Sequence, residues 1–190
     1  MSTRGSRAEF ERLFLPHLQR AYSLARWMLR NAEDAEDMVQ DAYLKAYQAF
    51  DSYAGGDAAA YMLAIVRNTA LSHLRRASAR RNVVPLRTVR EDDAEASDID
   101  SVADDAPMAD EVLIGRAERD RVRAAIEALP LPFREVIVLR ELEELSYAEI
   151  ASLLQVPVGT VMSRLARARG RLKELLGKEL SEGGESHGLS

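Results

Sequence analysis

Residues 82–111 interrupt a chain that is otherwise patterned for helices. They carry two basic and ten acidic residues, a net charge of −8, and the stretch EDDAEASDIDSVADDAPMAD within them is poor in large apolar side chains. Such a segment cannot bury enough apolar surface to offset the conformational entropy lost on folding. It therefore divides the 190-residue chain into two parts, each long enough for one small domain.

Apolar residues recur at helical spacing on both sides of this segment. The spacing predicts helices over 10–29, 31–50, 58–80, 112–129, 133–141, 146–153 and 158–176. Asn31 is the expected N-cap of the second helix, and Gly55-Gly56 separates it from the third. No strand-like alternation stands out. We predict an all-α fold with two small helical domains, 1–81 and 112–177, joined by a flexible acidic linker, 82–111, and followed by a disordered tail, 178–190.

Several classes of function lack the residues they need. The chain has no cysteine, which excludes disulfides, thiolate catalysis and cysteine zinc sites. Its three histidines, His17, His73 and His187, are isolated and lack metal-ligand spacing. No phosphate-cradling glycine loop and no nucleophile–base pattern occurs. We therefore expect that the chain is not an enzyme and that it binds no cofactor, metal or small-molecule substrate. With no signal-peptide pattern and no apolar run of about 18 residues, we expect a cytoplasmic protein that does not span a membrane.

The most specific motif is LSYAEIASLLQVPVGTVMSRLARARGRL, residues 145–172. Ser146 and Glu149 form a capping-box pattern at the start of one helix. The short turn at 155–157 then leads to a second helix, and residues 162–178 hold six basic residues against one Glu. This pattern predicts a helix-turn-helix whose second helix lies in the DNA major groove. An ordinary helical hairpin with a solvated basic face is the simpler alternative.

Two further segments, DAEDMVQDAYLKAYQAF (34–50) and YMLAIVRNTALSHLRR (61–76), narrow the choice. Together with residues 129–172 they closely resemble, in the same order, segments of the extracytoplasmic-function (ECF) family of RNA polymerase sigma factors. The resemblance covers about residues 8–81 and 112–176. It implies a sigma region 2 domain, which docks on core polymerase and reads and melts the −10 element, and a region 4 domain, which reads the −35 element.

The resemblance also implies site residues. Those expected to read the −35 element in the major groove are Thr160, Met162, Ser163, Arg164, Ala166 and Arg167. Those expected to contact the melted −10 strand are Tyr53, Gly55, Gly56, Asp57, Arg67, Asn68, Ser72, Arg75 and Arg76. Core polymerase docking is expected at Asp37, Gln40, Asp41 and Leu44. Residues 64–81 hold five Arg and no acid, which suits contact with DNA. For Tyr53, the competing interpretation is that it belongs to a loop that only connects two helices and does not contact DNA.

The expected partners are core RNA polymerase, promoter DNA and, as is common in the family, an anti-sigma factor. A stand-alone helix-turn-helix regulator is the main alternative; such a protein would normally dimerise on a two-fold operator. The first 81 residues show neither a receiver-domain pattern nor an obvious ligand pocket. A protein-binding adaptor is a third possibility, but it would leave both basic helices unexplained.

Overall fold

The computed structural model describes residues 7–80 and 110–182, and all regular structure in these ranges is helical. The elements of the first range are α1 (Arg7–Phe14), η1 (Leu15–His17), α2 (Leu18–Leu29), α3 (Ala32–Gln48), η2 (Phe50–Ser52) and α4 (Ala58–Arg80). Those of the second are α5 (Asp110–Ala128), α6 (Leu131–Ile137), η3 (Val138–Leu142), α7 (Tyr147–Leu154) and α8 (Val158–Glu182). The predicted all-α class is confirmed. The linker and the last residues of the tail lie outside the described residues.

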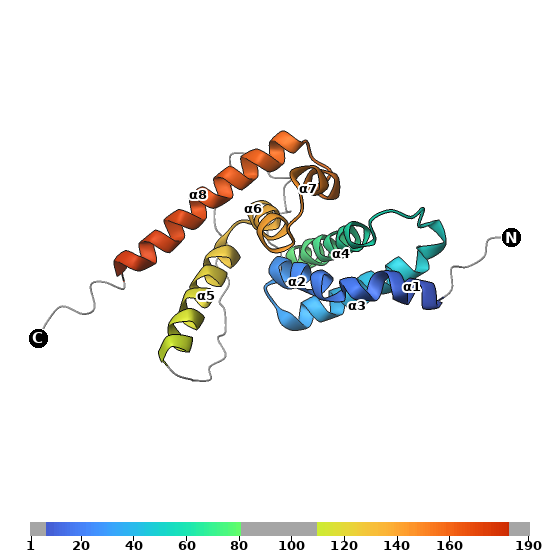
Figure 1. The fold of residues 1–190 in the computed structure, drawn as a ribbon, viewed down its shortest axis with the longest axis horizontal. Helices are drawn as coiled ribbons and strands as arrows, with labels where there is room; N and C mark the ends of the chain where they lie inside the picture. Colours follow the sequence, from blue (N-terminus) through green and yellow to red (C-terminus); the bar gives the residue numbers. More distant parts are fainter. Residues whose placement is uncertain (1–6, 81–109, 183–190) are drawn as a thin grey trace, which may run out of the picture.

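Helices α2, α3 and α4 pack against one another and form the bundle of the first half (Figure 1). Small residues such as Ala21, Ala25 and Ala42 are fully buried, which lets these helices approach closely. Aromatic rings close one end of the bundle, where Phe14 contacts the rings of Phe10, Phe50, Tyr53 and Tyr61. Asn31 accepts a hydrogen bond from the backbone N–H of Asp34 at 3.0 Å, which confirms it as the N-cap of α3.

The helix expected over 10–29 is wrong in one respect, because the structure divides it into α1, the 3₁₀ turn η1 and α2. Pro16 lies in that turn. Its ring has no N–H to donate and clashes with the preceding turn of an α-helix, so a continuous helix is interrupted here. Because apolar residues keep helical spacing on both sides of Pro16, the spacing alone did not predict the break.

The second half is built around α6 and α8. Val136, Leu139, Ile150 and Leu165 are almost completely buried and form its core. After α6 the chain makes one π-helical turn, η3, in which the N–H of Glu143 bonds to the carbonyl of Val138 at 3.0 Å. Helix α8 runs to Glu182, beyond the expected end at residue 176. No proline stands in that extension, and a helical glycine such as Gly177 costs only about 1 kcal/mol.

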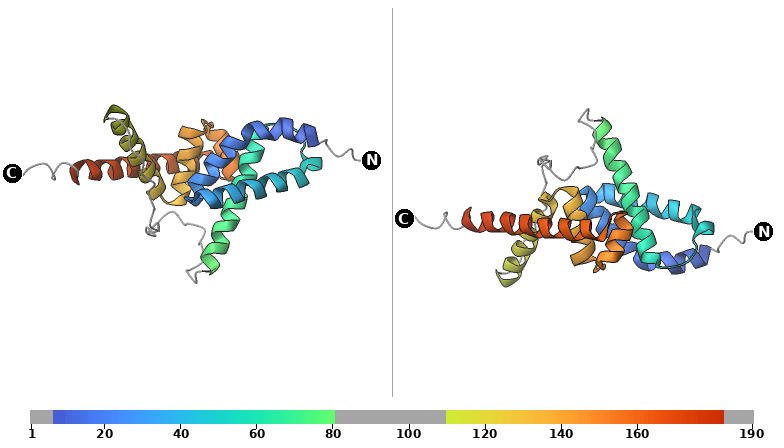
Figure 2. Two further views of the ribbon diagram at one scale, coloured as in Figure 1. Left: turned by 90° about the horizontal axis from the view of Figure 1, so that it is seen from below. Right: turned by 90° about the horizontal axis from the view of Figure 1, so that it is seen from above.

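The two halves pack against each other. Helix α2 contacts α6 and η3, and α4 contacts α7, so α6 lies between the first bundle and α8 (Figure 1). The C-terminal turns of α4 project beyond this body, as both views in Figure 2 show. The junction therefore covers part of α4 and leaves its last turns free of the second half.

Candidate nucleic-acid interface

Helices α7 and α8 form the predicted helix-turn-helix. The capping box is present: Ser146 Oγ accepts the N–H of Glu149 at 3.2 Å, and Glu149 Oε2 accepts the N–H of Ser146 at 2.7 Å. Gln155 ends α7 in the left-handed conformation, with φ of 57°. Two N–H groups at the start of α8 bond to the carbonyl of Pro157. These local bonds fix the turn that sets α8 relative to α7.

One face of α8 is buried and the other is exposed. Val161, Leu165 and Ala168 face the core. Of the residues expected to read the −35 element, Met162, Ser163, Ala166 and Arg167 are exposed, whereas Thr160 and Arg164 are half-buried. Most of this set therefore lies on the outward face, where a major groove could reach it.

The loop expected to hold a flipped base is well ordered by its own contacts. Gly55 and Gly56 have φ of +86° and +105°, which only glycine adopts without strain. Asp57 caps α4 by accepting the N–H groups of Ala59 and Ala60. Tyr53 is half-buried, its ring packs on Phe14, and its hydroxyl donates to the carbonyl of Gly56 at 2.8 Å. Tyr53 thus already has a structural role in the loop.

The residues expected to contact the −10 element on α4 fall into two groups. Asn68, Arg75 and Arg76 are exposed, and Ser72 is half-buried with its hydroxyl donating to the carbonyl of Asn68. Arg67 is different. Its guanidinium donates to the Glu135 carboxylate of α6 at 3.0 and 3.5 Å, and only 16% of its side chain is exposed. The structure does not place Arg67 on the same free surface as its neighbours.

The expected polymerase-docking residues share one exposed face of α3. Asp37, Gln40, Asp41 and Leu44 all reach solvent, and Leu44 is 59% exposed. Tyr47, which the sequence analysis did not single out, continues this face as a second large exposed apolar side chain. Its signal was the three-residue spacing from Leu44, which puts both on one side of a helix.

The junction between the halves is polar, and sequence reasoning missed it entirely. Arg20 of α2 donates to the carboxylate of Glu143 at 2.7 Å and to its backbone carbonyl at 3.0 Å. Arg134 of α6 donates to the carbonyls of Trp27 and Leu129, and burial lowers its pKa to about 10. Burial likewise raises the pKa of Glu135, against the opposing attraction of Arg67 and other arginines.

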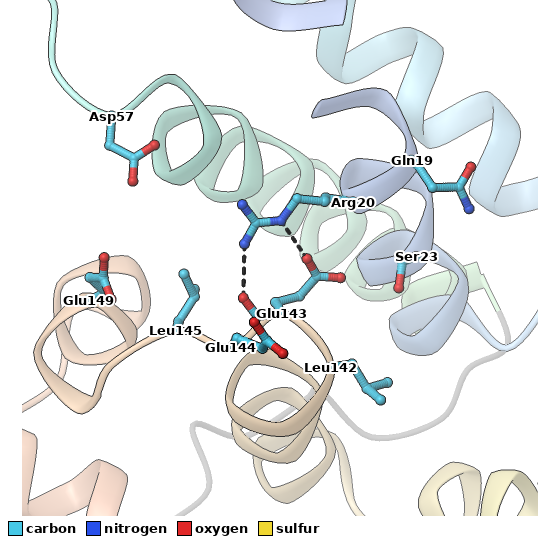
Figure 3. A pocket seen from close by; sticks show the side chains of 9 residues that line it. All are labelled: Gln19, Arg20, Ser23, Asp57, Leu142, Glu143, Glu144, Leu145 and Glu149. Atoms are coloured by element: carbon cyan, nitrogen blue, oxygen red, sulfur yellow. Dashed lines mark hydrogen bonds and ion pairs between the residues drawn. The ribbon is translucent and has the colours of Figure 1, made fainter. Parts of the chain in front are cut away.

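A polar cavity of about 610 Å³ opens at this junction. Figure 3 shows Arg20 extending toward Glu143, with which it forms a hydrogen bond. Asp57, just before α4, and Glu149 of α7 lie on one side of this pair. Four acidic residues line the cavity, namely Asp57, Glu143, Glu144 and Glu149. Among the residues that the structure describes, no group of acidic or histidine side chains could hold a metal ion.

The chain matches two family models, sigma-70 region 2 over residues 13–80 and sigma-70 region 4 over residues 119–172. It is 34% identical to the RNA polymerase sigma-H factor of Pseudomonas aeruginosa over 94% of this chain and 92% of that protein. It is also 35% identical to the ECF RNA polymerase sigma factor SigM of Mycobacterium tuberculosis, over 91% of this chain and 80% of that one. The chain belongs to the ECF family of sigma-70 factors.

Two solved structures are similar to this sigma factor over most of its length. One is the sigma factor RpoE bound to the anti-sigma factor NepR from Bartonella quintana, with a TM-score of 0.66, 25% identity, and coverage of 89% of this chain and 97% of that one. The other is CnrH in complex with the cytosolic domain of CnrY, with a TM-score of 0.60, 25% identity, and coverage of 92% and 91%.

As a sigma factor, the chain binds core RNA polymerase and promoter DNA and directs promoter-specific transcription initiation. Sigma factors are initiation factors rather than enzymes. The stand-alone regulator is not favoured, because the region 2 match accounts for the first half, which that alternative left without a role. No helix that the structure describes is long and apolar enough to span a bilayer.

Proposed function

We propose that the two halves of this sigma factor divide promoter recognition between double-stranded and opened DNA. Residues 1–81 are the region 2 domain and 112–177 the region 4 domain, joined by the acidic linker at 82–111. The observation that carries this proposal is that each half presents one basic helical surface opposite a buried core: the outward face of α8 and the exposed turns of α4.

In region 4, Arg164 and Arg167 read base edges of the −35 element. Arginine offers two donors in a plane, which match the O6 and N7 acceptors of guanine in the major groove. Ser163 and Met162 stand exposed beside them and contribute to sequence preference. Thr160 and the N-terminus of α8 are suited to bind a DNA phosphate. The small side chain of Ala166 lets the DNA approach the helix closely.

In region 2, the loop at 51–57 and α4 act on the opened −10 strand. Asn68, Ser72, Arg75 and Arg76 line one stretch of α4 and supply hydrogen-bond donors and positive charge. Gly55 and Gly56 have no atom within 4 Å of where a Cβ would stand, so a base could approach the loop backbone closely. Asp57 supplies a fixed carboxylate there. Tyr53 supports the loop, and its half-buried ring is the expected surface for contact with a base.

The exposed face of α3 docks on core polymerase. Its composition, an exposed Leu44 surrounded by Asp37, Gln40 and Asp41, combines an apolar centre with a polar rim. We further infer that the protein works in the cytoplasm, where core polymerase is found, and has no catalytic activity of its own, because the polymerase holds the catalytic metals.

An anti-sigma protein is a second expected partner. Both similar solved structures are complexes, and one of them is a sigma factor bound to an anti-sigma factor. Since this chain has no cysteine, oxidant or metal sensing through thiols would have to reside in that partner. Polymerase reconstituted from core and purified chain should therefore not respond to oxidant through this subunit.

Transcription from a promoter library by core polymerase, with and without this chain, tests the proposal. The chain is expected to select a defined pair of elements. Arg164→Ala or Arg167→Ala should then weaken closed-complex binding and relax specificity at the upstream element, whereas Asn68→Ala should impair melting. Permanganate reactivity on matched duplex and pre-opened templates separates these steps.

The exposed Lys173 on the same helix as Arg167 is the matched control, because Lys173→Ala removes one positive charge away from the expected reading positions. It should lower affinity uniformly, without relaxing sequence preference. Equal defects of all these variants at both steps would contradict the division of labour.

A further inference from the structure

Helix α8 lies along one edge of the molecule, and α5, α6 and α7 pack against its inner side (Figure 1). Its outward face carries two rows of side chains, since residues four apart lie above one another on a helix. One row is polar and holds Ser163 and Arg167. The other consists of Val158, Met162 and Ala166, which are all exposed, and we call it the apolar stripe. The face expected in the major groove is therefore not uniformly basic.

The apolar stripe points away from the protein. Val158 is 43% exposed and Met162 is 54% exposed. Val161 and Leu165, on the inner side of the same two turns, are buried and anchor the helix in the core. One exposed apolar side chain is ordinary on a protein surface, but here three share the surface that we assign to DNA. This grouping indicates that the stripe contacts something apolar in the groove.

The surface around Met162 leaves room for DNA. Gly159, in the first turn of α8, is exposed and has no atom within 4 Å of the place where a Cβ would stand. Ala166, at the other end of the stripe, carries only a methyl group. Met162 has the longest side chain of the stripe, and its unbranched thioether adapts to the shape of the group that it meets.

The group in the major groove that matches an apolar side chain is the C5 methyl of thymine. Adenine, guanine and cytosine present hydrogen-bond donors or acceptors at their major-groove edges. A methionine side chain placed against such an edge removes its water and supplies no replacement hydrogen bond, which costs free energy. The stripe therefore favours thymine both by contact with its methyl group and by the cost imposed on the other bases.

We propose that Met162, with Ala166 beside it, reads a thymine methyl group, so that this sigma factor selects an A·T pair at one position of the −35 element. Arg167, in the neighbouring polar row, reads a guanine close to that thymine. The inference rests on the proposed function, which places this face of α8 in the major groove, and it adds the class of base that Met162 reads.

The test removes the methyl group from the DNA and leaves the protein intact. Holoenzyme is formed from core polymerase and the full chain, and a promoter library identifies its preferred −35 element. Each thymine of that element is then replaced in turn by deoxyuridine, which lacks only the C5 methyl group. One of these substitutions is expected to weaken binding about fourfold, the change that corresponds to one buried CH₂-sized group.

Variants of Met162 assign that effect to one side chain. In Met162→Ala the sensitivity to deoxyuridine should disappear, because the contact is lost from the protein side. Met162→Arg should move the preference at the same base pair from A·T toward G·C, since arginine donates to the O6 and N7 acceptors of guanine. Val122→Ala is the matched control, because Val122 is 44% exposed on α5 and lies outside the expected DNA-reading set. It should keep both the binding and the fourfold effect.

The inference is overturned if no deoxyuridine substitution weakens binding, or if Met162→Ala responds to deoxyuridine as the original chain does. Circular dichroism checks that each variant is folded, and Met162→Gln, which keeps the length of the side chain, replaces Met162→Ala should that variant unfold. The proposed function is judged separately by Arg167→Ala. That variant should relax the preference at the guanine and leave the deoxyuridine effect in place, whereas an unchanged base preference would count against α8 as the reading helix.

Discussion

The ion pair between Arg67 and Glu135 makes a measurable contribution to the stability of the free protein. Its main hydrogen bond is 3.0 Å long and its second is at the 3.5 Å limit, so we count one strong bond to a charged group, about 1.5–3 kcal/mol. Removing one partner of a buried pair costs about 3–5 kcal/mol when the other charge is left alone. Here Arg134 and Arg164 still attract Glu135, so the loss should be smaller.

We therefore expect Arg67→Ala to weaken the packing of the two halves by about 2 kcal/mol, a factor of about 30 in the ratio of packed to separated halves. Urea titrations of Arg67→Ala, Glu135→Gln and the double variant, monitored by circular dichroism, give the coupling between the two residues. The exposed pair of Arg169 and Glu141, 2.7 Å apart within the second half, is the control and should show coupling near the measurement error. Equal coupling for the two pairs would refute the reasoning.

Three further outcomes follow from local features of the structure. Ser146→Ala removes the N-cap of α7 and should lower the free energy of unfolding by about 1 kcal/mol, measured by urea titration. The hydrogen bonds from Ser146 lower the pKa of Glu149, so the stabilisation from its carboxylate is complete at neutral pH and is lost as the pH falls through that lowered pKa. On acidification, the unfolding midpoint of Ser146→Ala should therefore fall less than that of the original protein. Leu44→Ala should weaken core polymerase binding several-fold in a competition assay and leave the unfolding midpoint unchanged. Gln48→Ala, also exposed on α3, should change neither the binding nor the midpoint. Arg167→Ala should cost about 1–3 kcal/mol of discrimination at one upstream base pair, measured by binding of holoenzyme to single-substitution promoters. Lys173→Ala should weaken binding to all of these promoters equally and keep the original base preference.

The sequence alone determined the features that depend on neighbours within a helical turn or two. The N-cap Asn31 and the capping box of Ser146 and Glu149 were both predicted from the sequence, because the partner of each cap lies three residues away. Helical periodicity separated the halves at the acidic segment. The break at Pro16 was within reach of this reasoning, since proline is a local signal, but the continuous apolar spacing outweighed it.

Only the tertiary structure decided which charged groups meet across the junction. Arg67 and Glu135 are 68 residues apart, and Arg20 and Glu143 are 123 apart. With 26 basic and 31 acidic residues in the chain, charge alone permits many pairings, and no spacing rule distinguishes them. The packing of α2 against α6 and of α4 against α7 selects these two pairs, because it buries both glutamates within hydrogen-bond distance of those arginines. The exposure of Arg67, one of the expected DNA contacts, is therefore set by how the halves pack. The exposure of Arg75 and Arg76 follows from their place near the end of α4.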